Sequence, residues 1–170
     1  MTETPGTMPD IIARNEQAVQ RTLKALGRLS PAQMVAPLLA DGRTVKDVLA
    51  HMTWWDLWLL ATLPAIPGAP PIDLPLADQI PASGQWADEM NAKVFVHNQS
   101  RPLSEILVEF ATTLERLLDR VALLTLDDLY APDGMSAVVG QPVAPLILGI
   151  YEHYEEHAHE FEQLCASLGV

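Results

Sequence analysis

The sequence predicts an all-helical protein, a four-helix bundle, from three observations. Four long segments repeat apolar residues every three or four positions, which is the period of a helix with one buried face. No segment shows a convincing alternation of apolar and polar residues, the pattern of a half-buried strand. Prolines and capping residues separate the segments, at places where helices are expected to begin or end.

The first half of the chain contains two of these long helices. The first is expected over about residues 9–28, and its predicted buried side carries Ile12, Val19, Leu23 and Leu26. A short helical turn is expected at residues 30–33, where a capping serine precedes a proline and, at the third helical position, a glutamine. The second long helix is expected to begin at a capping box over residues 44–47 and to end before Pro64.

A proline-rich crossover over residues 64–84 separates the two halves, and its residues 64–81 hold six of the fourteen prolines. A moderate helix is expected over about residues 85–97, and a strongly periodic one from Pro102 to about Leu124. Thr125 then caps a second short helical turn.

We expect one domain over residues 1–170, with a flexible N-terminus at residues 1–8. A chain of 170 residues has the length of one ordinary domain. The helices on either side of the crossover are too few to form separate cores, so the crossover is interpreted as a connection within one bundle.

The last helix, expected over about residues 142–167, carries the most informative pattern. Its apolar stripe consists of Val143, Ile147, Ile150, Tyr154, His157, Phe161, Leu164 and Leu168. The intervals alternate between four and three residues, which is the seven-residue repeat of a bundle helix. His157 occupies a position where this repeat calls for an apolar residue, so its side chain is expected inside the bundle.

Composition excludes several classes of function. Hydrophobic residues make up 49% of the chain, which excludes a disordered protein. The formal net charge of −12, without a cluster of Lys or Arg, argues against partners such as nucleic acid or an anionic membrane. Cys165 is the single cysteine, so neither a disulfide framework nor a cysteine-based zinc site is expected. With no signal peptide and no apolar run of about 20 residues, we expect a soluble cytoplasmic protein.

The histidines carry the chemical signal. His153 lies four residues before His157, so the two imidazoles share one helix face and can bind one divalent ion. His51 lies at the edge of the core-facing stripe of the second long helix, so three histidines from two helices can form one metal site. Eight acidic residues and no basic ones lie in residues 121–170, which favours a cation near this site. The alternative is that buried histidines are ordinary hydrogen-bonded core residues and that the acids form a solvated face.

Other candidate residues have both functional and structural interpretations. Asp47 is either an acceptor for the ring N–H of His51 or only the third residue of the capping box. Glu152 and Glu156 are weak candidates for a catalytic base, because they lie off the buried stripe and are expected to be solvated. Candidate walls of a ligand pocket, which can equally be core packing, are Trp54, Trp55, Trp58, Tyr151 and Tyr154.

Three segments resemble a known family. Residues 44–56 (TVKDVLAHMTWWD), Asn91-Ala92 with residues 98–107 (NQSRPLSEIL), and residues 151–157 (YEHYEEH) are similar to motifs of DinB-like four-helix bundles, in particular the ClbS/DfsB branch. The resemblance implies a divalent metal, zinc or nickel, bound by His51, His153 and His157. One departure is Asp56, which stands where the branch commonly has glutamate. The long crossover is another, and it is expected to reshape the mouth of the pocket.

The resemblance also implies an activity. The ClbS/DfsB branch protects against a reactive genotoxic metabolite by hydrolysing its electrophilic cyclopropane, whereas other DinB-like bundles are thiol-dependent transferases. The leading hypothesis is therefore an enzyme that inactivates a small reactive metabolite by hydrolysis or group transfer. The alternatives are a metal-free bundle that binds or sequesters a small molecule, and a structural bundle that forms a homodimer.

Overall fold

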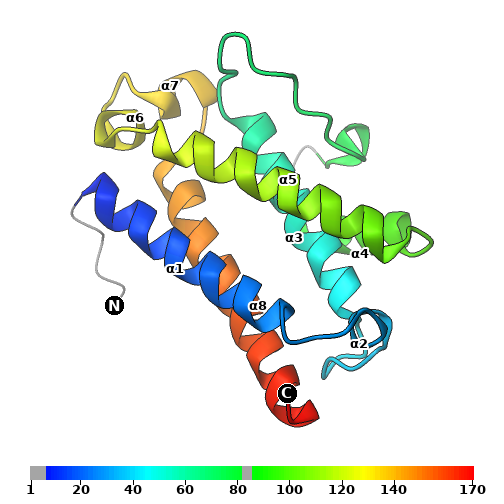
Figure 1. Cartoon of the computed structure of the whole chain (residues 1–170). Coiled ribbons are helices and arrows are strands. Elements are labelled where there is room, and N and C mark those ends of the chain that lie inside the picture. The colour runs from blue at the N-terminus through cyan, green and yellow to red at the C-terminus, as the bar shows by residue number, and fades with distance from the viewer. Residues whose placement is uncertain (1–6, 82–85) are drawn as a thin grey trace. The chain divides into compact units, whose positions relative to one another are not determined.

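The computed structural model describes residues 7–81 and 86–170, and the fold in these residues is all-helical, without strands (Figure 1). The chain forms two compact units, one of Met1–Ser30 with Leu118–Val170 and one of Pro31–Leu117. Among the described residues, no helix is long and apolar enough to span a membrane. The expectation of a single domain stays a prediction.

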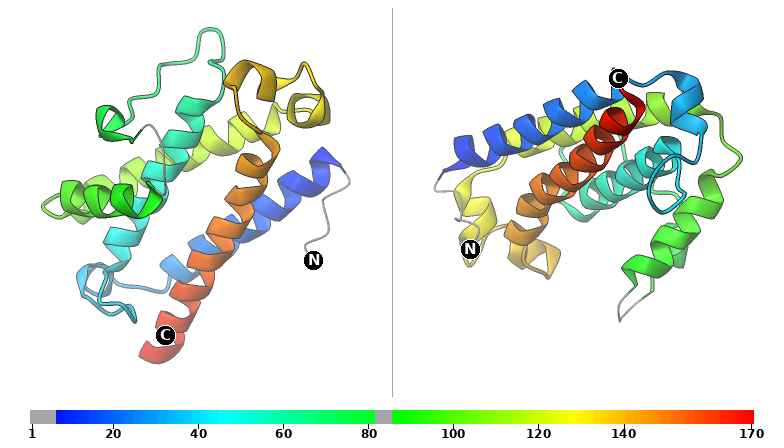
Figure 2. Two further views of the ribbon diagram at one scale, coloured as in Figure 1. Left: turned by 180° about the vertical axis from the view of Figure 1, so that it is seen from behind. Right: turned by 90° about the horizontal axis from the view of Figure 1, so that it is seen from below.

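In the first unit, the two long helices α1 (Met8–Leu26) and α8 (Ala144–Leu168) lie side by side, as Figures 1 and 2 show. The thiol of Cys165 is fully buried and donates a hydrogen bond to the carbonyl of Ala25, 3.4 Å away. Cys165 is therefore a small core residue at the contact of the two helices.

The buried face of α8 is the predicted one. All the stripe residues from Val143 to Leu164 are buried, and Leu168 at the end of the helix is half-buried. His157 is 5% exposed, as its place in the seven-residue repeat predicts. The repeat thus identifies which side of the helix faces the interior.

The buried face of α1 differs from the predicted one. Leu23, assigned to the core, is 41% exposed, and Ile12 is only half-buried. The buried residues of α1 are Met8, Ile11, Asn15, Ala18, Val19, Thr22, Ala25 and Leu26. The prediction was wrong because it followed the large apolar side chains, whereas much of this face consists of small and polar residues.

Short elements complete the first unit. The Thr125 capping box is present and begins α6 (Leu126–Tyr130), as predicted. A second short helix, α7 (Met135–Val139), was not predicted, because five residues are too few to show a helical period. Of the segment 1–8, Thr7 caps α1 and Met8 is buried in its first turn, while residues 1–6 lie outside the described residues.

The second unit contains the remaining predicted helices. The short turn is α2 (Pro31–Val35), and the second long helix is α3 (Val45–Thr62), which begins at the predicted capping box. The moderate helix predicted over residues 85–97 is α4 (Ala87–Asn98). The strongly periodic helix predicted from Pro102 is α5 (Leu103–Ala122), whose last residues belong to the first unit.

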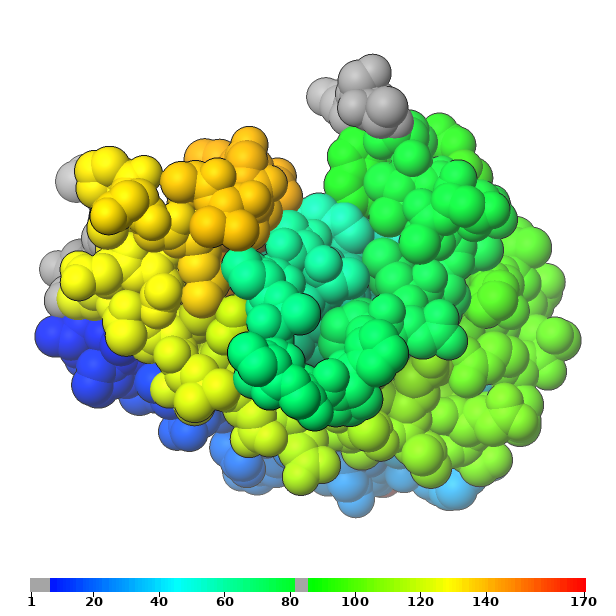
Figure 3. Space-filling view, turned by 90° about the horizontal axis from the view of Figure 1, so that it is seen from above, coloured from blue at the N-terminus to red at the C-terminus, as the bar shows by residue number. Residues whose placement is uncertain are grey.

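The crossover is attached to the helices of this unit rather than projecting from them. It contains one turn of 3₁₀ helix, η1 (Ala77–Gln79), and follows the surface as a curved green band in Figure 3. Its carbonyls accept hydrogen bonds from three helical side chains, Trp54 to Pro75 (2.8 Å), Lys93 to Gln79 (3.1 Å) and Arg116 to Pro70 (3.0 Å). The last part of the predicted crossover, residues 82–84, lies outside the described residues.

Candidate metal centre

The two histidines of α8 converge as their spacing predicts. The Nε2 atoms of His153 and His157 are 3.1 Å apart, and the ring centroids are 4.8 Å apart at an interplanar angle of 70°. His157 is buried and His153 is half-buried. The spacing of one helical turn thus brings a nitrogen of each ring within 3.1 Å of the other. The ring of His157 lies in the core, and the ring of His153 lies closer to solvent.

The separation of the two nitrogens suits a shared ion. With bonds of about 2.0–2.1 Å, two imidazole nitrogens on one zinc ion are separated by about 2.9 Å at a right angle and about 3.4 Å at a tetrahedral angle. The observed 3.1 Å lies between these values. The pair therefore fits a divalent cation, and without an ion one Nε2–H donates a hydrogen bond to the other ring.

A carboxylate supports the second ring of the pair. Nδ1 of His157 lies 3.1 Å from Oε2 of Glu160, three residues further along α8. Glu160 was not predicted from the sequence as a partner of His157. The signal was present, because residues at positions i and i+3 of a helix lie on the same face.

His51 is the candidate ligand of the second unit. It lies in α3, is half-buried, and its ring meets the edge of Trp55 with centroids 6.4 Å apart at 67°. The capping box fixes the start of this helix one turn earlier. In that box Oδ2 of Asp47 accepts hydrogen bonds from the backbone N–H (2.9 Å) and the hydroxyl (2.7 Å) of Thr44. Asp47 thus acts as a capping residue, and its contact with the ring of His51 stays a prediction.

The candidate pocket tryptophans form one packed cluster in the second unit. Trp55 is its centre, with an edge contact to Trp54 (5.1 Å), an edge contact to Trp58 (5.6 Å) and a stacked contact to Trp86 (5.4 Å). Met90 and Val94 of α4 and three residues of the crossover, Leu74, Leu76 and Ile80, pack against this cluster. The indoles therefore form one apolar cluster within the unit, and their role as a ligand wall stays a prediction.

The candidate tyrosines lie on different sides of α8. Tyr154 is fully buried, and its ring meets His153 edge to face with centroids 6.4 Å apart. Tyr151 is half-buried, and the guanidinium of Arg14 lies 5.9 Å from its ring centroid. The contact with Arg14 gives Tyr151 a packing role between α1 and α8.

The remaining candidates are exposed. Glu152 and Glu156 are both exposed, as expected for solvated carboxylates. His159, exposed on the same helix, lies 2.8 Å from the amide nitrogen of Gln163, and His97 is exposed in the last turn of α4. The last two histidines are therefore separate from the pair in α8.

Comparison with known proteins assigns the family. Residues 16–144 match the domain described as the mycothiol maleylpyruvate isomerase N-terminal domain, which covers most of the chain. The chain belongs to this family. The family is a DinB-like one, and domains of this superfamily often bind a metal ion. The matched residues include His51 and end before His153, so the evidence for the pair in α8 is its own geometry. Assignment to the ClbS/DfsB branch stays a prediction.

A solved structure supports the fold of this DinB-like domain. The crystal structure of an uncharacterised protein from Escherichia coli UTI89 superposes with a TM-score of 0.74 over 100% of this chain and 99% of its own length. The two sequences are 11% identical, so the likeness shows the fold alone. It supports the predicted all-helical fold. No curated protein sequence matches the chain.

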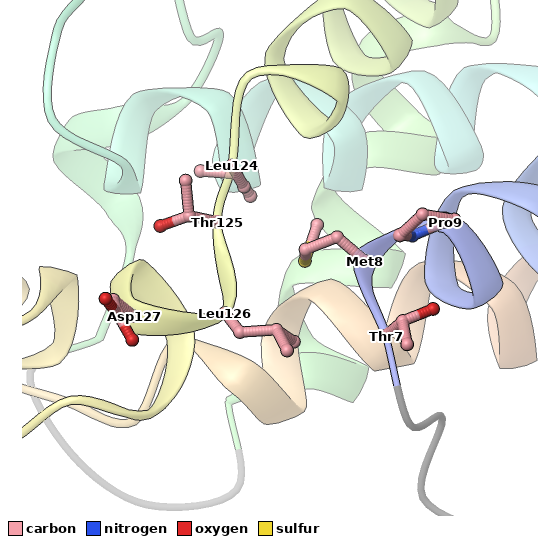
Figure 4. A pocket seen from close by; sticks show the side chains of 7 residues that line it. All are labelled: Thr7, Met8, Pro9, Leu124, Thr125, Leu126 and Asp127. Carbon is pink, nitrogen blue, oxygen red and sulfur yellow. The ribbon is translucent and has the colours of Figure 1, made fainter.

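The first unit has a surface pocket that none of the histidines lines. It is lined by Thr7, Met8 and Pro9 and by the chain from Leu124 to Asp127, and its volume is about 440 Å³. In Figure 4 the side chains of Met8 and Leu126 point toward each other across it. The pocket is open and mainly apolar, and neither a charged cluster nor a histidine lines it.

Proposed function

We propose that this protein is a metal-dependent transferase or hydrolase that inactivates a small reactive metabolite. In this proposal His153 and His157 bind one divalent ion, zinc or nickel, and His51 is the third ligand. The observation that carries the proposal is the placement of two Nε2 atoms 3.1 Å apart on α8, one from the buried His157 and one from the half-buried His153. Membership of a DinB-like family supports it independently.

The residues of the chain have defined tasks in this proposal. The three imidazoles hold the ion through neutral rings and leave further coordination positions open for water or substrate. A bound divalent ion supplies Lewis acidity, which favours the ionised form of water or of a thiol. Glu152 and Glu156 are the candidate bases nearest in sequence to the pair, and each must turn inward to act, because both are exposed.

Two sources of nucleophile are consistent with the proposal. The family takes its name from an isomerase that uses mycothiol, which favours a low-molecular-weight thiol as cosubstrate. The resemblance to the ClbS/DfsB branch instead favours hydrolysis of an electrophilic small molecule by water. We place the reaction in the cytoplasm, where small thiols are kept reduced.

A second candidate function is metal-free binding of an apolar small molecule. The observation that favours it is the cluster of four tryptophans in the second unit, three of which are only half-buried. Aromatic side chains that keep one face accessible can form a wall for an apolar ligand. In this case the histidines serve as hydrogen-bonding partners. The protein then binds a fixed number of ligand molecules and consumes no more.

Metal content tests the proposed site. Protein purified without a histidine tag is expected to contain about one equivalent of zinc or nickel, or to bind one after exposure to the salt. His51→Ala and His157→Ala are expected to lower this content strongly, because each removes a ligand. His159→Ala is the matched control, since it removes an exposed histidine of the same helix. Wild-type protein that cannot be loaded, measured by elemental analysis, contradicts the site.

Turnover separates the candidate activities. Isomerisation of maleylpyruvate is measured with mycothiol, with glutathione and without a thiol, and consumption of an electrophilic cyclopropane is measured with water alone. Multiple turnovers of isomerisation that require a thiol indicate thiol-dependent chemistry, and multiple turnovers of the cyclopropane with water alone indicate a hydrolase. Consumption that stops at one equivalent of protein supports the binding protein and contradicts the enzyme.

A further inference from the structure

We infer that Glu160 is a positioning residue for the metal centre, because it holds the ring of His157 in the tautomer that a metal ligand requires. The inference rests on the proposed function, and it adds a residue outside the three proposed ligands. Glu160 determines which nitrogen of the His157 ring carries the proton and in which direction that ring points.

The contact between the two side chains is local and sheltered. Glu160 follows His157 by three residues in α8, and its Oε2 lies 3.1 Å from Nδ1 of the imidazole. The side chain of His157 is 6% exposed and that of Glu160 is 24% exposed. Because little water reaches this contact, the hydrogen bond faces weak competition and restrains the rotation of the ring.

The chemistry of the two groups sets the tautomer. A carboxylate can only accept hydrogen bonds, so the proton of this contact belongs to Nδ1 of His157. A neutral imidazole with its proton on Nδ1 has a lone pair on Nε2. That lone pair is 3.1 Å from Nε2 of His153, on the side where the pair would share an ion.

The two rings of the pair are therefore not equivalent. If Nε2 of His157 is the acceptor in the contact with His153, then His153 carries its proton on Nε2 in the metal-free protein. Metal binding requires His153 to move that proton to Nδ1, whereas His157 already has the tautomer of a ligand. Carboxylates that orient ligating histidines in this way commonly strengthen metal binding.

The other acids of α8 have different surroundings. Glu155 and Glu162 bind the guanidinium of Arg21 on the side facing α1. Glu152 and Glu156 are exposed. Glu16 of α1, an exposed acid of the same unit with no part in the proposed site, therefore provides the control for net charge.

The first test reads the tautomers directly in metal-free protein. Long-range ¹H–¹⁵N spectra of the imidazoles are expected to show His157 with its proton on Nδ1 and His153 with its proton on Nε2. Glu160→Leu is expected to shift His157 toward the Nε2–H form, whereas Glu160→Gln, which keeps an accepting oxygen, retains the Nδ1–H form. A wild-type His157 protonated on Nε2 alone, or a tautomer unchanged in Glu160→Leu, overturns the inference.

The second test measures zinc affinity by competition with a chromophoric chelator. Glu160→Leu is expected to weaken binding by about 10- to 100-fold, with a smaller loss in Glu160→Gln and none in Glu16→Gln. Equal affinity of wild type and Glu160→Leu overturns the inference, and so does an equal loss in Glu16→Gln, which indicates a general effect of charge.

The two tests separate the failure of this inference from the failure of the proposed function. If wild-type protein binds no zinc, the proposed site fails, while the spectra of the metal-free protein still decide the tautomer of His157. If wild type binds zinc and Glu160→Leu binds it equally well, the site stands and the positioning role fails. Circular dichroism of the metal-free variants checks the fold, and Glu160→Ala, which also removes the accepting oxygen, replaces Glu160→Leu if that variant does not fold.

Discussion

A buried amide in α1 shows how much a single side chain can lower the stability of the fold. Asn15 is 1% exposed, and within residues 7–81 and 86–170 neither its amide nitrogen nor its amide oxygen has a hydrogen-bonding partner. A buried polar group without a partner costs about 1–3 kcal/mol relative to water. The buried face of α1 therefore contains one position at which an apolar residue should fit better than the native one.

We predict that Asn15→Leu raises the free energy of unfolding by about 1 kcal/mol or more, because leucine has a similar shape and needs no hydrogen bonds. Asn98→Leu is the matched control. Asn98 is also buried, but its amide donates to the carbonyl of Val94 (2.8 Å) and accepts from Arg101 (2.9 Å), so this change should be destabilising. Urea unfolding measures both. A destabilised Asn15→Leu protein contradicts the prediction.

At the scale of helices, the sequence predicts α8 much better than α1. The seven-residue repeat of α8 is carried by large side chains, and one histidine in the repeat does not obscure it. The contact side of α1 is marked by small and polar residues such as Ala18 and Thr22, which carry little hydrophobic signal. Periodicity therefore identified the helix but not its buried face.

Some contacts around the candidate site can be predicted from the sequence, and others cannot. The i, i+4 spacing predicted the approach of His153 and His157, because helix geometry alone sets the distance between their side chains. Local spacing also connects Glu160 to His157, but several acids lie on this helix and only the structure shows which one reaches the ring. The pairing of Arg21 with Glu155 and Glu162 joins residues far apart in the sequence, so no local pattern predicts it.

The ion pairs of Arg21 give the contact between α1 and α8 a dependence on pH. The guanidinium donates two hydrogen bonds to Glu162, 3.0 Å and 2.6 Å long, and these lower the pKa of the Glu162 carboxyl below its usual 4.5. A carboxyl with a lowered pKa stabilises the fold above its unfolded pKa. The contribution is lost as the pH falls through its folded pKa.

We predict that Glu162→Gln lowers the free energy of unfolding by about 0.5–1 kcal/mol at pH 7, a modest value because the pair is about one third exposed. The difference from wild type should disappear as the pH falls through the lowered pKa of Glu162, because the wild-type carboxyl then also becomes protonated. Glu152→Gln, which removes an exposed charge of the same helix, is the control for net charge. A difference that persists at low pH contradicts the assignment.

At the scale of the whole molecule, the net charge of −12 is unevenly distributed along the chain. Residues 121–170 hold eight acids and no lysine or arginine, and five of these acids lie on α8. Two of the five bind Arg21 of α1, one contacts His157, and two are exposed. The five acids of α8 therefore have three kinds of surroundings: an ion pair with Arg21, a contact with His157, and solvent.

The aromatic residues are divided between the two compact units. All four tryptophans lie within Pro31–Leu117, and all three tyrosines lie in the unit that contains α8. His51 touches Trp55, whereas His153 and His157 belong to the other unit. Tryptophan fluorescence is therefore expected to report on an ion bound at His51.

We predict that one equivalent of Ni²⁺ quenches the tryptophan fluorescence of the metal-free protein, because an open-shell ion bound at His51 lies beside the indole of Trp55. Both His51→Ala and His157→Ala should abolish the quenching at that stoichiometry, and Trp55→Phe should reduce it. His97→Ala and His159→Ala, which remove exposed histidines, should leave it unchanged. Quenching that survives in His157→Ala indicates an ion bound without the α8 pair. Quenching that survives in His51→Ala excludes His51 as the third ligand.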